Sequence, residues 1–120
     1  MLIRRLSDCR EITAKDGCRL RELLHPDRGV AGLPYSVAMA WVEPGKSTHP
    51  HRLTAETEVY VVVRGRGRMR IDEECAELGP GDSIVIPAGA RQWIECVGAE
   101  PLQFLALVSP PWRVDHDVLA

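Results

Sequence analysis

Two histidines, two glutamates and one glutamine are the residues of this chain whose types and spacing could do chemistry. His49 and His51 are two positions apart, Glu56 and Glu58 follow closely, and Gln92 comes later. Residues two apart in a β-strand project from the same face, so His49 and His51 would lie side by side on an extended segment. A neighbouring strand that begins at Glu58 would bring a carboxylate opposite them. Two imidazoles and one carboxylate with open positions can hold Fe(II), and would also accept Mn, Ni or Zn.

The segments that must position these residues read as short strands. Apolar stretches rich in β-branched residues, among them 59–63, 83–86 and 102–108, lie between Gly and Pro residues at short intervals. Each stretch is too short for a typical helix, and their spacing is typical of an all-β sandwich or barrel. The stretch 18–24 fits a helix or a strand equally well. No repeat or linker divides the chain, so we expect one small β-barrel over residues 1–120.

Composition narrows the classes of function. The chain has 120 residues, enough for one domain with one core, and its net charge of −2 lacks the basic excess of nucleic-acid-binding proteins. It contains no run of about 20 apolar residues that would span a bilayer, and no apolar N-terminal signal segment. Four cysteines, at positions 9, 18, 75 and 96, form no Cys-x-x-Cys pair. We therefore expect a cytoplasmic protein with free thiols that binds neither nucleic acid nor membrane.

Arginine alternates with other residues from Arg64 to Ile71. A period of two predicts that Arg64, Arg66, Arg68 and Arg70 share one sheet face. Two interpretations follow. The run forms a solvated face that discourages edge pairing, or it forms an anion site if that face lines a cavity.

Two segments resemble the motifs of the cupin family. Residues 45–65, Gly-Lys-Ser-Thr-His-Pro-His-Arg-Leu-Thr-Ala-Glu-Thr-Glu-Val-Tyr-Val-Val-Val-Arg-Gly, resemble the first motif, Gly-x5-His-x-His-x(3–4)-Glu-x6-Gly. Residues 81–96, Gly-Asp-Ser-Ile-Val-Ile-Pro-Ala-Gly-Ala-Arg-Gln-Trp-Ile-Glu-Cys, resemble the second, Gly-x5-Pro-x-Gly-x2-His-x3-Asn. The glycines and the proline match in both. The resemblance implies a double-stranded β-helix, or jelly-roll, barrel, with residues 1–34 as an N-terminal strand segment.

The resemblance is weaker at the ligand positions. It gives His51 the place of the first metal-binding histidine and Glu58 the place of the glutamate. Leu53 stands where the second histidine belongs, and a leucine cannot coordinate a metal. Gln92 and Cys96 replace the histidine and the asparagine of the second motif. Two of the usual four ligands are therefore unchanged.

His49 lies on the same expected strand face as His51 and could compensate for a missing ligand. Gln92 could offer its carbonyl oxygen. The resemblance therefore implies a divalent metal, Fe, Mn, Ni or Zn, held by His49, His51, Glu58 and Gln92, with Tyr60 as the nearby candidate for proton transfer. A metal-free barrel, with Gln92 hydrogen-bonded to Glu58 or His51, stays open as the alternative.

Three other residues receive no role in this set. Glu56 is interpreted as a solvated turn residue. His25 precedes a proline and His116 lies in the polar C-terminal tail, so neither is expected to bind a metal.

Family resemblance leads to two main hypotheses of function. The first is a metal-dependent enzyme, a dioxygenase, isomerase, decarboxylase or lyase, that acts on a small oxygen-rich substrate. The alternative is a barrel that binds a sugar or an organic acid without chemistry and has a degenerate metal site. A third interpretation is a structural dimer subunit, and we expect a homodimer that pairs through edge strands of the N-terminal segment.

Overall fold

The computed structural model describes all residues 1–120 and shows a chain of short antiparallel strands. The stretches between Gly and Pro residues form these strands, as the sequence predicts, because they are short and rich in β-branched residues. The stretch 18–24, which was ambiguous, is a strand. Two 3-10 turns are the only helical segments, η1 (Leu6–Asp8) and η2 (Val114–His116). The strands are β1 (Glu11–Thr13), β2 (Arg19–Leu24), β3 (Ser36–Val42), β4 (His51–Leu53), β5 (Thr57–Arg64), β6 (Gly67–Ile71), β7 (Glu74–Leu78), β8 (Ser83–Ile86), β9 (Gln92–Cys96), β10 (Leu102–Ser109) and β11 (Asp117–Leu119).

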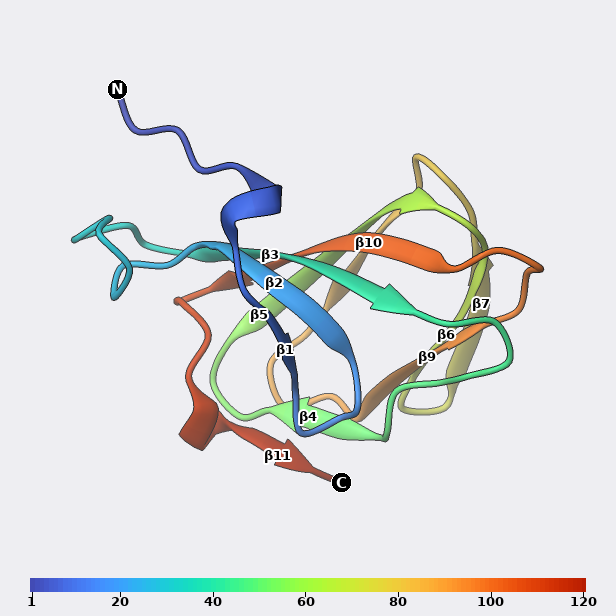
Figure 1. The fold of residues 1–120 in the computed structure, drawn as a ribbon. Coiled ribbons are helices and arrows are strands. Elements are labelled where there is room, and N and C mark those ends of the chain that lie inside the picture. The colour runs from blue at the N-terminus through green and yellow to red at the C-terminus, as the bar shows by residue number, and fades with distance from the viewer.

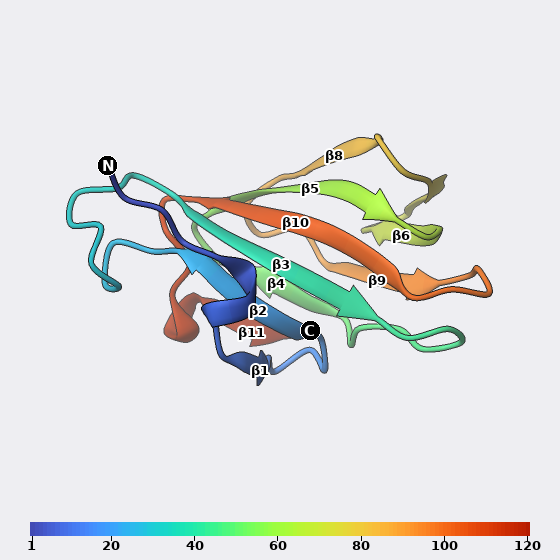
Figure 2. The same ribbon diagram turned by 45° about the horizontal axis from the view of Figure 1, so that its top comes forward.

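Two antiparallel sheets face each other (Figure 1). One has six strands in the order β1-β2-β3-β10-β5-β8, and the other has five in the order β11-β4-β9-β6-β7. Figure 2 shows the strands of the six-stranded sheet side by side across the molecule. This arrangement confirms the predicted all-β jelly-roll barrel. The two strands that carry the first motif, β4 and β5, lie in different sheets, so their side chains meet across the interior.

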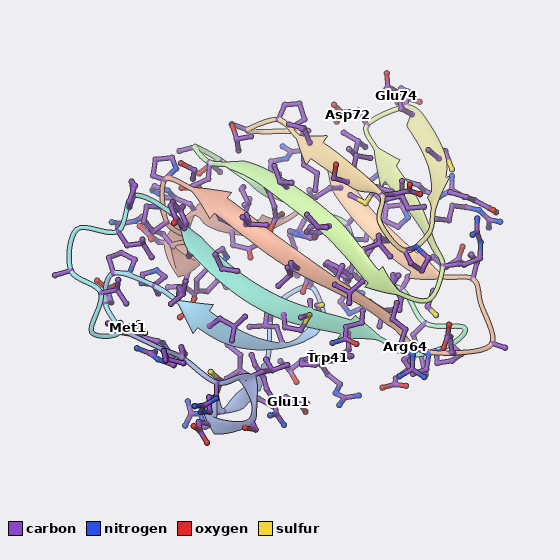
Figure 3. The ribbon with its side chains drawn as sticks, turned by 90° about the horizontal axis from the view of Figure 1, so that it is seen from above. Met1, Glu11, Trp41, Arg64, Asp72 and Glu74 are labelled. Carbon is purple, nitrogen blue, oxygen red and sulfur yellow. The ribbon has the colours of Figure 1, made fainter.

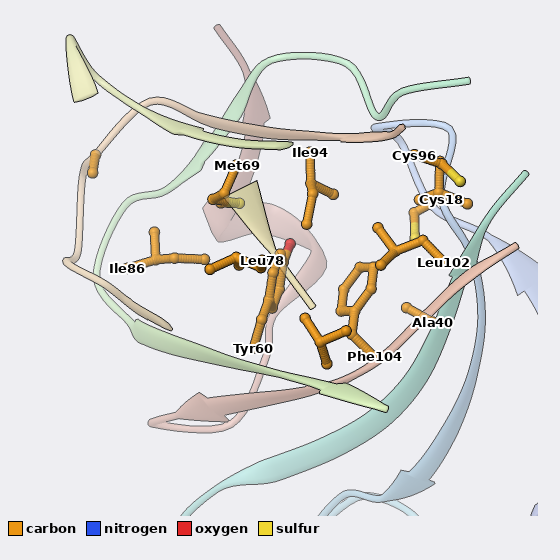
Figure 4. Packing of buried hydrophobic residues seen from close by; sticks show 13 residues of the cluster. Cys18, Ala40, Tyr60, Met69, Leu78, Ile86, Ile94, Cys96, Leu102 and Phe104 are labelled. Atoms are coloured by element: carbon orange, nitrogen blue, oxygen red, sulfur yellow. The ribbon is translucent and has the colours of Figure 1, made fainter. Parts of the chain in front are cut away.

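The core fills the space between the sheets. Glu58, Tyr60 and Val62 alternate along β5 and are all buried, because successive strand residues point to opposite faces. Figure 4 shows Tyr60 reaching from β5 towards the opposite sheet, from which Ile94 projects. The ring of Phe104, on β10, packs against Tyr60 with 4.3 Å between the ring centroids. The alternation that builds the core therefore also holds the Glu58 carboxyl group inside.

The arginine run is divided between two strands. β5 ends at Arg64, which lies at the end of the sheet in Figure 3, and Gly65 turns the chain with a φ of +80° before β6 begins. Arg68 lies on the outer face of β6, where its guanidinium donates to one glutamate on each neighbouring strand at 3.1 Å. The prediction of a single strand face is wrong because the glycine breaks the strand. The solvated-face interpretation is confirmed, and the anion site is not, because these side chains turn away from the interior.

Two simpler expectations concern cysteines and membranes. All four cysteines are free, as the sequence predicts. The structure contains no helix with the length and hydrophobicity that a membrane crossing requires.

Candidate functional site

A cavity of about 200 Å³ lies inside the barrel, and most of its lining is apolar. The walls come from β1, β2, β3, β5 and β10, from β4, and from the C-terminal segment after β10. Within this apolar lining, buried polar side chains with acid, base or hydrogen-bonding capacity gather, among them Asp16, His51, Glu58, Tyr60 and Asp117. A group of ionisable side chains in an otherwise apolar cavity is the usual form of a small-molecule site.

His51 is the best oriented of these residues. It opens β4, is 3% exposed, and its Nδ1 lies 3.0 Å from the carbonyl oxygen of His49. A carbonyl can only accept, so Nδ1 must carry a proton and donate it. The other nitrogen, Nε2, lies 3.5 Å from Oδ2 of Asp16. Nε2 is therefore the nitrogen that can take up a proton, with a carboxylate beside it to stabilise the resulting imidazolium.

Asp16 is placed by the turn between β1 and β2. Its Oδ1 accepts a hydrogen bond from the backbone N–H of Cys18 at 3.0 Å, which leaves Oδ2 to face His51. Burial raises the pKa of the Asp16 carboxyl above its ordinary value, while the charge of His51 acts in the opposite direction. Asp16 and His51 thus lie side by side as a buried acid–base pair.

Glu58 is held by a short chain of hydrogen bonds. The Tyr60 hydroxyl donates to Oε1 of Gln92 at 3.1 Å, and Nε2 of Gln92 donates to Oε1 of Glu58 at 3.0 Å. Gln92 has no exposed surface, and it lies opposite His51 in the pairing of β4 with β9. Burial raises the pKa of Glu58 to about 8, so this carboxyl group holds a proton at neutral pH. Burial also raises the pKa of Tyr60 well above its ordinary value, so its hydroxyl acts as a donor.

The structure brings together His51, Glu58 and Gln92 but leaves His49 outside. β4 begins only at His51, so the two-residue period of the strand does not extend back through Pro50 to His49. The His49 side chain is exposed, and its Nε2 lies 3.3 Å from the position a Cβ would take on Gly17. Across the chain, no three His, Cys, Asp or Glu side chains converge as metal ligands.

The donor set therefore does not fit the predicted divalent metal. Both ends of the Gln92 amide are engaged, with Tyr60 and with Glu58. Leu53 is buried at the cavity wall, where it contributes apolar surface instead of a ligand. A resident metal ion would need at least a third ligand that these side chains do not supply.

Asp117 and Trp112 are site residues that the sequence did not reveal. Asp117 opens β11 and is 5% exposed, and its Oδ2 accepts a hydrogen bond from the Trp112 indole N–H at 3.0 Å. Its Oδ1 is buried without any hydrogen-bond partner. Neither Asp117 nor Asp16 lies in a motif. Asp117 lies in the polar C-terminal tail, and Asp16 precedes Gly17 in a turn. Only the closed fold brings them to the cavity.

Glu56 is a correction. The sequence predicted a solvated turn residue, but the side chain is 2% exposed and its Oε1 pairs with Nδ1 of His116. The reason is that the C-terminal segment crosses the turn between β4 and β5, where the N–H of Thr54 donates to the His116 carbonyl. The pair fastens this segment to the barrel outside the cavity lining.

Comparisons with known proteins agree with this architecture. A family model described as a cupin domain matches residues 39–108. An uncharacterised protein of Methanocaldococcus jannaschii is 40% identical over 106 residues, which cover 88% of this chain and 84% of that protein. A cupin 2 domain-containing protein of Halorhodospira halophila has a similar solved structure, with 30% identity and a TM-score of 0.73 over 82% of this chain and 68% of its own. The nucleoside dehydratase Pac13 of Streptomyces is similar in fold alone, with 17% identity and a TM-score of 0.81 over 100% of this chain and 91% of its own.

Proposed function

The chain belongs to the cupin family, and from that premise we propose that it is an enzyme of the lyase or isomerase type that moves protons on a small oxygen-rich substrate. The observation that carries the proposal is that a proton acceptor and a proton donor line one buried cavity. His51 has an Nε2 that makes no hydrogen bond and lies beside Asp16, and Glu58 keeps a proton at neutral pH. Such a pair is what proton abstraction next to a carbonyl, followed by proton return or loss of a hydroxyl group, requires.

In this proposal His51 is the general base. Its Nε2 removes a proton from a substrate carbon, and the electron pair of that C–H bond moves into the substrate. Asp16, 3.5 Å away, stabilises the imidazolium that forms. The hydrogen bond from Nδ1 to the His49 carbonyl holds the ring in the tautomer that the step needs.

Glu58 is the general acid. Its Oε1 accepts from Gln92, so the proton resides on Oε2. In a lyase reaction, that proton goes to a leaving hydroxyl group, the C–O bond breaks, and water and a double bond are the products. In an isomerase reaction, the proton goes to the carbonyl oxygen of the substrate, the proton on His51 returns to the neighbouring carbon, and the hydroxyl group that becomes the new carbonyl gives its proton back to Glu58. Gln92 and Tyr60 are positioning residues in this proposal, because their hydrogen bonds hold the Glu58 carboxyl group.

A binding barrel without chemistry is the second candidate. Of the 21 residues that line the cavity, 13 are hydrophobic, which favours capture of a ligand as much as its conversion. The metal-dependent form expected from the resemblance has no fitting donor set, so no step of the proposal uses a metal.

Exchange of substrate hydrogen with solvent tests the proposal. The protein, stripped with a chelator, is incubated in D₂O with a panel of small hydroxy-aldehydes, hydroxy-ketones and nucleosides, and ¹H NMR follows the loss of C–H signals. We expect the wild type to catalyse exchange or elimination, and we expect His51→Gln and Glu58→Gln to lose this activity. Arg64→Gln, which changes an exposed residue at the end of β5 outside the cavity lining, should keep it. Turnover only after addition of Fe, Mn, Ni or Zn would contradict the proposal. Binding without exchange or turnover would favour the second candidate instead.

A further inference from the structure

Acidic residues outnumber basic ones in the cavity lining. It contains the carboxyl groups of Asp16, Glu22, Glu58 and Asp117, of which Glu58 holds a proton at neutral pH, and it contains no arginine. Its single lysine, Lys15, donates to the backbone carbonyls of Val114 at 3.0 Å and of Asp117 at 3.1 Å. An anionic ligand such as a carboxylate or a phosphate normally requires a guanidinium or a free ammonium to receive it. This cavity offers neither.

One residue of the cavity lining has a buried acceptor without a hydrogen-bond partner. Oδ1 of Asp117 is buried and has no hydrogen-bond partner, although Oδ2 of the same group is bound to Trp112. Leaving a buried carboxylate oxygen without a donor is unfavourable, and such atoms are rare in folded proteins. Because Asp117 lines the cavity, a donor on a bound molecule would satisfy this oxygen.

The rest of the cavity suits an uncharged body. β3 presents Ala38 and Ala40 to it, and their small side chains leave space, while Leu20 and Phe104 supply apolar surface. Glu22 is already paired with Arg28 at 2.8 Å, so it does not compete for the ligand. The carboxyl groups of Asp16 and Glu58 lie close enough to Asp117 for its charge to disfavour their ionisation. A cation at Asp117 would relieve that repulsion.

We propose that this cavity selects a small primary amine that also carries hydroxyl or carbonyl oxygen, with its ammonium group on Asp117 and its uncharged body against the apolar walls. The inference rests on the proposed function, whose substrate class it names. The proposed ligand is a cation, whereas the sequence led us to expect a sugar or an anionic organic acid.

Matched probes of one shape test this selection. Cyclohexylammonium, cyclohexanol and cyclohexanecarboxylate differ only in the polar group, and the indole N–H signal of Trp112, assigned with Trp112→Phe, reports binding beside Asp117. We expect the ammonium probe to bind at least about tenfold more tightly than the alcohol, as a charge-assisted hydrogen bond provides, and the carboxylate to bind most weakly. Equal or tighter binding of the carboxylate would overturn the proposal, and this ranking needs no variant.

Asp117→Asn provides the second measurement. The amide keeps an acceptor for Trp112 but loses the charge, so the ammonium probe should lose about tenfold in affinity while cyclohexanol binds as before. Asp115→Asn, an exposed change on the same segment, should leave both unchanged. Unaltered ammonium binding in Asp117→Asn would also overturn the proposal. Since these are binding measurements, a failed exchange assay with intact ammonium selectivity would refute only the enzyme, and the reverse result would refute only the amine.

Discussion

At the scale of single residues, the chemistry depends on one amide. Gln92 offers an oxygen to the Tyr60 hydroxyl and a nitrogen to the Glu58 carboxyl, so it connects a donor on β5 to an acceptor two residues earlier on the same strand. Burial is what keeps this carboxyl group protonated, and the nearby charges of Asp117 and Asp16 act in the same direction. The hydrogen bond from Gln92 acts in the opposite direction, so the amide orients Glu58 and only partly offsets the effect of burial on its pKa.

Glu58→Gln should change how stability depends on pH. The pKa of Glu58 is about 8 in the folded protein against an ordinary value of 4.5, so between these values the folded state holds a proton that the unfolded state has lost. The free energy of unfolding of the wild type should therefore fall as pH rises from about 5 to 8. The full effect is up to about 5 kcal/mol, at about 1.4 kcal/mol for each unit of pKa difference.

Urea unfolding at several pH values measures this effect. The difference between the wild type and Glu58→Gln isolates residue 58, since the other buried acids are common to both proteins. That difference should move in favour of the variant as pH rises. A difference that is constant with pH would show that Glu58 has the same pKa in both states.

Tyr60→Phe tests the other end of the hydrogen-bond series that runs from Tyr60 through Gln92 to Glu58. Removing the hydroxyl leaves Oε1 of Gln92 buried without a donor, which should reduce the free energy of unfolding by about 1–3 kcal/mol. In the proposed enzyme, the variant should lower the rate by disordering Glu58, and should shift the basic limb of its pH profile. A change in stability with an unaltered pH profile would assign Tyr60 a structural role only.

At the scale of elements, the sequence predicted strands well and strand ends poorly. The alternation and the Gly and Pro positions were sufficient for the sheets, because they act locally. The end of β5 at Arg64 and the start of β4 at His51 depend on single residues, Gly65 and Pro50, that interrupt an otherwise regular pattern. For this reason His49 was expected inside and lies outside.

Gly65→Ala should disrupt the turn between β5 and β6. A Cβ there would lie 2.5 Å from the Pro101 carbonyl oxygen and 2.9 Å from Cα of Leu102, and neither backbone atom can move away easily. With the cost of a φ of +80°, we expect a loss of about 3 kcal/mol or more in the free energy of unfolding.

Gly81→Ala is the matched control for this turn. Its φ is +89°, but no atom lies within 4 Å of the added Cβ, so only the backbone cost of about 1 kcal/mol should appear. Chemical denaturation of both variants gives the comparison. Equal losses at the two positions would mean that the contact with Pro101 contributes nothing.

At the scale of the whole molecule, the cavity is closed by the two ends of the chain. Asp16 and Lys15 come from the first hairpin, while Trp112, Val114 and Asp117 come from the last segment, which is added to the second sheet where β11 pairs with β4 (Figure 1). These residues are about 100 positions apart, so no spacing rule relates them. The motifs predicted the half of the site that lies on β4, β5 and β9, and could not predict the half that the termini supply.

Lys15 joins these two ends, which makes it a test of the closure. Its ammonium donates to the carbonyls of Val114 and Asp117. Lys15→Met should therefore loosen the C-terminal wall of the cavity, residues 112–120, while the sheets stay folded. Hydrogen exchange of residues 112–120 should become several-fold faster than in the wild type, while that of β5 and β10 stays the same. Lys46→Met removes the other lysine, an exposed residue in the loop after β3 that does not line the cavity, and should leave all three segments unchanged. Equal exchange of residues 112–120 in both variants would mean that Glu56 and His116, or the pairing of β11 with β4, hold the wall without help from the first hairpin.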